Sequence, residues 1–118
     1  MKKVAITVNK ENDNIYKQFG HCSRFKVFEV NDDNRIVSYQ YLPVADGQEE
    51  PTLDAMVQND VNVIISEGVG PGVVDRIEEN GVSIEVYAGV KGKADDAIIK
   101  YLSGMLEKDP SVHACIVG

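Results

Sequence analysis

A continuous apolar run, VNVIIS at residues 61–66, constrains the fold more than any other stretch of the chain. Strands with one face in solvent alternate apolar and polar side chains, whereas strands covered on both faces are apolar throughout. Helical apolar spacing precedes this run at residues 51–60 and follows it at residues 73–80. The run therefore predicts an inner strand of a sheet that carries helices on its faces, joined by right-handed parallel crossovers.

The first part of the chain predicts three more strands. Residues 2–8, KKVAITV, are rich in β-branched side chains and end at a polar loop. Residues 24–30 and 35–42 alternate polar and apolar side chains, and NDDN at residues 31–34 joins them as the turn of an antiparallel hairpin. Four side chains of the second strand compete for its inward face: Phe25, Val27, Phe28 and Val30.

Three amphipathic helices and one further strand complete the prediction. The apolar stripes comprise Leu53, Met56 and Val57 in the first helix, Val73, Val74 and Ile77 in the second, and Ala94, Ala97, Ile98, Tyr101, Leu102 and Met105 in the third. Gly81 ends the second helix, and residues 82–89 predict the fifth strand. The order is β-β-β-α-β-α-β-α, an α/β fold with a five-stranded mixed sheet in which residues 2–8 lie centrally, beside residues 61–66. The tail at residues 107–118 fits either a terminal strand or a segment that docks elsewhere.

Size, charge and cysteine content limit the class of protein. The 118 residues predict a single domain over residues 1–118, with a core at about residues 3–103. The net charge of -7 would repel a phosphate backbone and an anionic membrane surface, so we expect neither nucleic acid nor membrane as a partner. Three cations, Lys17, Arg24 and Lys26, cluster in the sequence, and we interpret them as solvated. The chain has two cysteines and no secretory signal, which predicts a reducing, cytoplasmic setting.

The stretch FGHCSRF at residues 19–25 holds one histidine and one cysteine behind a glycine. Thiolate and imidazole are ligands for iron, zinc and copper, and Gly20 permits close approach of a ligand to the backbone. Adjacent residues of an extended chain point to opposite sides, however, so His21 and Cys22 alone do not close a metal site. From these residues alone, the favoured interpretation is a buried, packing Cys22 and a surface His21.

Two glycine-rich loops and the tail offer further candidate residues. SEGVGPG, with Gly68 and Gly70, follows one parallel strand, and the loop with Lys91 and Lys93 follows the next. Backbone N–H groups where a helix begins bind anions, although a tight turn explains the glycines equally well. These loops are expected to open on the same edge of the sheet. His113 and Cys115 suit either metal ligation or a half-buried strand. Glu67 is a lone carboxylate here, and no catalytic constellation emerges.

Two stretches together resemble a known family. FGHCSRFKVFEV resembles its FG-x-C-x-x-F motif, and SEGVGPGVVDRIEENGVSIEVYAG resembles its strand, glycine-proline turn, helix and strand. The family is that of dinitrogenase iron-molybdenum cofactor biosynthesis, which contains NifX and the carboxyl-terminal part of NifB, and the likeness spans roughly residues 3–103. The residues that match are Phe19, Gly20, Cys22, Phe25, Gly68, Gly70, Pro71, Gly81, Val86 and Tyr87. His21 occupies a position that varies in the family.

The resemblance implies a ribonuclease H-like three-layer fold without nuclease residues, and a role in binding, carrying or storing an iron-sulfur or iron-molybdenum cofactor precursor. On this interpretation the chain is not an enzyme. Cys22, helped by His21, contacts the cluster, and Gly20, Gly68, Gly70 and Lys91 surround it. The partners are then the cluster itself or a protein that donates or accepts it.

Two alternatives remain open from the sequence. The first is a metal-free protein-interaction or regulatory domain in which Cys22 is merely buried. The second is an enzyme that acts on a small anionic substrate at the loop edge, with Glu67 and His21 as the only candidates for a general acid or base.

Overall fold

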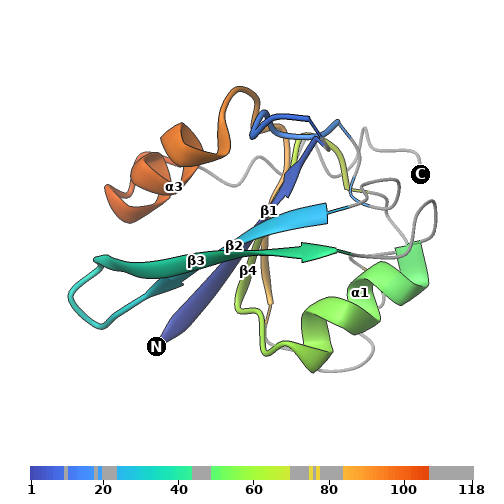
Figure 1. Cartoon of the computed structure of the whole chain (residues 1–118), viewed down its shortest axis with the longest axis horizontal. Coiled ribbons are helices and arrows are strands. Elements are labelled where there is room, and N and C mark those ends of the chain that lie inside the picture. The colour runs from blue at the N-terminus through green and yellow to red at the C-terminus, as the bar shows by residue number, and fades with distance from the viewer. Residues whose placement is uncertain are drawn as a thin grey trace.

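The computed structural model describes residues 1–9, 11–17, 19, 24–43, 49–69, 75, 77 and 84–106 of the chain. Within them, five strands form one mixed sheet in the order β3-β2-β1-β4-β5. The strands are β1 (Lys2–Val8), β2 (Arg24–Val30), β3 (Ile36–Pro43), β4 (Val63–Ile65) and β5 (Glu85–Tyr87), and the helices are α1 (Glu49–Gln58) and α3 (Ala94–Leu102). The two helices lie on opposite sides of the sheet, which gives three layers (Figure 1).

The strand order is compatible with the predicted five-stranded mixed sheet. β1 pairs antiparallel with β2 on one side and parallel with β4 on the other, and β4 pairs parallel with β5. β2 and β3 form the predicted antiparallel hairpin, and Asn34 in its turn has a φ of 59°. The run at residues 61–66 contributes only three residues to β4, all of them buried. β1 is therefore central and lies beside β4, as predicted.

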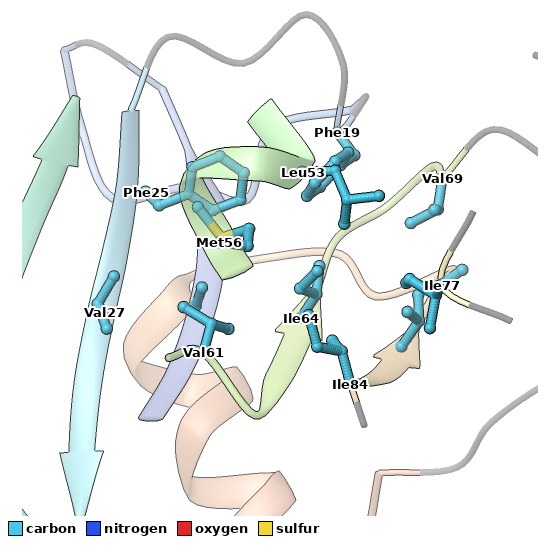
Figure 2. Packing of buried hydrophobic residues seen from close by; sticks show 13 residues of the cluster. Phe19, Phe25, Val27, Leu53, Met56, Val61, Ile64, Val69, Ile77 and Ile84 are labelled. Atoms are coloured by element: carbon cyan, nitrogen blue, oxygen red, sulfur yellow. The ribbon is translucent and has the colours of Figure 1, made fainter. Parts of the chain in front are cut away.

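Alternate side chains of the sheet fill two separate cores. The first core lies between the sheet and α1 and includes Ala5, Ile64, Leu53 and Met56 (Figure 2). The second core lies between the sheet and α3 and includes Val4, Ile6, Val63, Ile65, Ala97 and Ile98. This explains the competition within β2: Phe25 and Val27 belong to the first core, and Phe28 and Val30 belong to the second.

Two predicted core residues are exposed, so these predictions are wrong. Val57 of α1 is 43% exposed, because the buried stripe of that helix runs through Thr52, Leu53 and Met56. Met105 is 71% exposed. It lies beyond α3, which ends before Gly104 turns the backbone to a φ of 71°, so helical spacing no longer applies to it.

The predicted second helix is described at two residues only. Asp75 and Ile77 are helical, and Ile77 packs in the first core near Ile84 (Figure 2). The other residues of that prediction, with Val73, Val74 and Gly81, and the tail at residues 107–118 lie outside the described residues. No helix in the described part of the chain is long and apolar enough to cross a membrane.

Candidate functional site

Loops that follow β1, β4 and β5 meet at the carboxyl edge of the parallel part of the sheet. The Phe19 N–H donates to the Gly68 carbonyl at 2.9 Å, which ties the loop after β1 to the loop after β4. The Gly89 N–H donates to the Glu67 carbonyl at 2.7 Å, which ties the loop after β5 to the same segment. These bonds confirm that the loops open on one edge, the place where ligands bind in open α/β sheets.

A buried pair of hydroxyl groups next to this edge forms hydrogen bonds with the loops. Thr7 and Ser66 are both fully buried, and their oxygens lie 3.2 Å apart across β1 and β4. Thr7 Oγ1 also lies 3.2 Å from the Tyr16 carbonyl, and Ser66 Oγ donates to the Gly68 carbonyl at 3.0 Å. Gly68 is therefore fixed from two directions. Sequence reasoning missed both hydroxyl residues, although Thr7 interrupts the apolar part of KKVAITV and Ser66 ends the apolar run VNVIIS.

Two phenylalanines flank the segment that contains the predicted metal ligands. Phe19 and Phe25 are fully buried, and their rings meet edge to face at a centroid distance of 5.4 Å and an angle of 70°. Figure 2 shows Phe19 beside Leu53 of α1 and Phe25 beside Met56. Phe19 therefore anchors the start of the FGHCSRF stretch in the first core and, through its N–H, on the loop of Gly68.

Four of the predicted site residues are not described. Gly20, His21, Cys22 and Gly70 lie outside the described residues, and so do the other histidine and the other cysteine. Among the residues that the structure does describe, no three histidine, cysteine, aspartate or glutamate side chains are placed to hold a metal ion. The roles of Cys22 and His21 therefore stay predictions.

The predicted site residue Lys91 lies close to the Gly68 loop. Its Nζ is 3.7 Å from Oε1 of Glu67, and its side chain is 77% exposed against 33% for Glu67. At this distance and exposure the ion pair is weak, so the ammonium group keeps most of its capacity to attract an anion. Glu67, the only carboxylate considered as a general acid or base, is the partner of that lysine.

A second charged cluster lies on the α3 side of the sheet, around Lys26. The Lys26 amine contacts Asp13 at 2.9 Å and Asp95 at 2.8 Å, and only 5% of the side chain is exposed. Burial lowers the pKa of this amine, but the hydrogen bonds to Asp95 and Asp13 outweigh burial and raise it above its ordinary value. The Lys26 bond in turn lowers the pKa of Asp13. The interpretation of Lys26 as a solvated cation is therefore wrong.

Arg24 and Lys93 lie close to this cluster. Arg24 donates to the Asn9 carbonyl at 2.8 Å and lies 3.4 Å from Asp13 Oδ1. A surface cleft of about 530 Å³ borders the cluster, and Lys93 lines it together with Asp13 and Asp95. Arg24 and Lys26 are thus bound to acidic partners within the protein. They do not form a basic surface patch.

Comparison with known proteins identifies a family that matches this chain and solved structures that are similar to it. The family model described as dinitrogenase iron-molybdenum cofactor matches residues 1–104. No curated protein sequence matches the chain significantly. Among solved structures, protein MJ0327 of Methanocaldococcus jannaschii has 25% identity and a TM-score of 0.69, over 92% of this chain and 94% of that one.

Two further structures, with lower sequence identity, share the fold. PH0822 has 21% identity and a TM-score of 0.78, over 92% of this chain and 96% of that one. The apo form of the orange protein from Desulfovibrio gigas has 18% identity and a TM-score of 0.73, over 93% of this chain and 94% of that one. All three similarities extend along nearly the whole of both chains.

Proposed function

The chain belongs to the dinitrogenase iron-molybdenum cofactor family, and from this membership we propose that it is a non-enzymatic protein that binds or carries an iron-sulfur or iron-molybdenum cofactor precursor. The proposal includes the ribonuclease H-like form of the α/β fold and a cytoplasmic setting, in which Cys22 remains a free thiol. The cargo is a preformed cluster that the protein receives from one partner and passes to another.

Family membership carries the function, and one observation supports the location of the site: the hydrogen bond between the Phe19 N–H and the Gly68 carbonyl. It joins the start of the FGHCSRF stretch to the glycine-rich loop after β4. The other end of the stretch is fixed as well, because Arg24 pairs with Val8 at the carboxyl end of β1. Cys22 is two residues from Arg24, and two residues of chain span at most about 7 Å. Covalent connectivity therefore supports a position for Cys22 near this edge.

The chemistry of a carrier fits this set of groups. A cluster that already holds bridging sulfides needs few protein ligands for capture, and thiolate is the usual ligand of its iron atoms. Incomplete coordination by the protein also favours later release. The exposed ammonium group of Lys91 and the N–H groups of the glycine-rich loops would stabilise an anionic cargo. Gly20, Gly68 and Gly70 would let the backbone approach the cluster closely.

Anaerobic reconstitution with ferrous iron and sulfide tests the proposal. We expect the purified protein to acquire iron and to show sulfur-to-iron charge-transfer absorption. Cys22→Ser should abolish most of this absorption, and His21→Ala should weaken it. The chain supplies matched controls, since Cys115→Ser and His113→Ala replace the same residue types in the tail and should leave the absorption unchanged.

The result also separates the proposal from its main alternative. A protein that stays colourless and acquires no iron under these conditions would contradict the carrier role and favour a metal-free interaction domain. Cluster binding that is equally strong in Cys22→Ser and in the unsubstituted protein would contradict the assignment of Cys22 as a ligand.

A further inference from the structure

β3 is an edge strand without the usual protection against pairing. Within the described part of the chain, no strand pairs with its outer side, and none of its eight residues is buried. Its sequence, IVSYQYLP, contains no charged residue, although 26% of the whole chain is charged. Natural edge strands are usually short or carry charges or an internal proline. Here the features of this kind are Pro43, at the last position, and the register irregularity at Val37, near the hairpin end, so the backbone donors and acceptors on the outer side of Ser38–Leu42 are open to a partner.

Two exposed tyrosines of β3, Tyr39 and Tyr41, are held in place by contacts with other side chains of the same chain. Val37, Tyr39 and Tyr41 are 53%, 57% and 41% exposed. The Lys26 amine lies 4.4 Å from the Tyr39 ring centroid, and the Arg24 guanidinium lies 4.4 Å from that of Tyr41. The Tyr41 hydroxyl donates to the Asp13 carboxylate at 2.9 Å, and the two rings meet edge to face. Rings that are already fixed lose little conformational entropy when a partner covers them.

The pattern of polar and apolar residues in β3 is symmetric about Tyr39. Ser38 and Gln40 on either side are both polar, and the next residues outward, Val37 and Tyr41, are both apolar. The following pair, Ile36 and Leu42, is apolar too. The register irregularity opposite Glu29 and Val30 adds one residue, Val37, to β3 at the hairpin end. Pairing with β2 is regular from Ser38 onward, and this part of β3 is centred near Tyr39.

We propose that two copies of this chain associate by antiparallel pairing of β3 with β3, about a two-fold axis through Tyr39. In such a pair Ser38 faces Gln40 of the second copy and the two Tyr39 residues face each other, so polar residues meet polar residues and aromatic residues meet aromatic residues. No like charges oppose each other along the strand, which matters for two molecules that each carry a net charge of -7. The symmetry of the sequence pattern is the reason that the partner is a second copy of this chain.

Sedimentation velocity over micromolar to millimolar concentrations, with two double variants, tests the proposal. Ser38→Lys with Gln40→Lys places lysine opposite lysine twice in the dimer, so its dissociation constant should rise about tenfold or more. Ser38→Lys with Gln40→Glu places opposite charges face to face at the same positions and should retain the dimer. A lysine at position 38 also keeps the partner of Ser38 within the chain, since Ser38 Oγ donates to Glu29 at 3.0 Å.

Thermal melts followed by circular dichroism verify that both variants are folded. A folded protein that remains monomeric at every concentration would overturn the proposal. Equal dissociation constants for the two double variants would overturn it as well. In the proposed pairing one variant places like charges face to face and the other places opposite charges face to face, so the two should differ. As a further control, Val57→Lys places a charge on an exposed apolar position of α1 and should leave the dimer intact.

Discussion

At the scale of single residues, the two carboxylates that bind Lys26, those of Asp13 and Asp95, should contribute unequally to the free energy of unfolding. Asp13 is 29% exposed and accepts hydrogen bonds from Lys26 and from the Tyr41 hydroxyl, whereas Asp95 is 63% exposed. Asp13→Ala should therefore lower the free energy of unfolding by about 2 kcal/mol, as expected for bonds to a partly buried charge. Asp95→Ala should lower it by about 1 kcal/mol, because Asp95 itself is mostly exposed and the buried Lys26 amine keeps Asp13 as a partner. Urea denaturation measures both, and equal losses would contradict this ranking.

The Asp13 carboxylate should also make the free energy of unfolding depend on pH. The hydrogen bond from Lys26 lowers the pKa of Asp13 below its ordinary value in the folded protein. A depressed folded-state pKa contributes stability above the unfolded pKa, and this contribution disappears as the pH falls through the folded value. Below about pH 4, the stability advantage of the unsubstituted protein over Asp13→Asn should therefore shrink. Urea denaturation at a series of acidic pH values measures this difference, and a constant difference would contradict the role of Asp13.

At the scale of elements, Gly92 holds the loop between β5 and α3. Its φ is 103°, outside the range that other residues adopt, and its carbonyl accepts the Ile15 N–H at 2.7 Å. No heavy atom lies within 4 Å of an added Cβ at Gly92 or at Gly104, so backbone strain alone decides the effect of alanine.

Gly92→Ala should therefore lower the free energy of unfolding by about 2 kcal/mol. Gly104 ends α3 with a φ of 71°, in the left-handed region, and Gly104→Ala should lower this energy by only about 1 kcal/mol. Chemical denaturation of the two variants side by side gives the comparison. A smaller loss for Gly92→Ala than for Gly104→Ala would show that the loop relaxes without strain.

The sequence pattern predicted best those strands whose formation depends on residues close to one another in the chain. The bounds of β1 and β2 match the prediction, because alternation and a turn rich in Asn and Asp depend on neighbouring residues only. Helical spacing predicted α1 and α3 but misplaced Val57 and Met105. Spacing gives the period of a helix, whereas the sheet decides which stripe is buried, and the Gly104 backbone decides where α3 ends.

The candidate site was predictable in its location and less so in its contacts. Parallel strands alone require that the loops of Gly68 and Lys91 share an edge, and the structure confirms this. The Thr7 and Ser66 pair was missed, because the sequence shows one polar residue in or next to each of two apolar runs and not their 3.2 Å separation. Lys26 was misjudged for the same reason, since its partner Asp95 lies 69 residues away.

At the scale of the whole molecule, the net charge and the charge-free β3 strand predict how salt affects association. Two copies that each carry a charge of -7 repel each other, while an interface along β3 contains no ion pairs for salt to weaken. Raising the ionic strength from about 0.01 M to about 0.15 M shortens the screening length from about 30 Å to about 8 Å. The proposed dimer should therefore become tighter by several-fold as salt is added.

The charged double variant gives the matched comparison for this salt effect. In Ser38→Lys with Gln40→Glu, screening also weakens the new pairs across the interface, so salt should tighten this dimer less than that of the unsubstituted chain. Sedimentation velocity at the two ionic strengths measures both dissociation constants. If salt instead loosened the dimer of the unsubstituted chain, attraction between charged surfaces would have to hold it together. The contact would then lie on another part of the molecule, because β3 has no charges to supply that attraction.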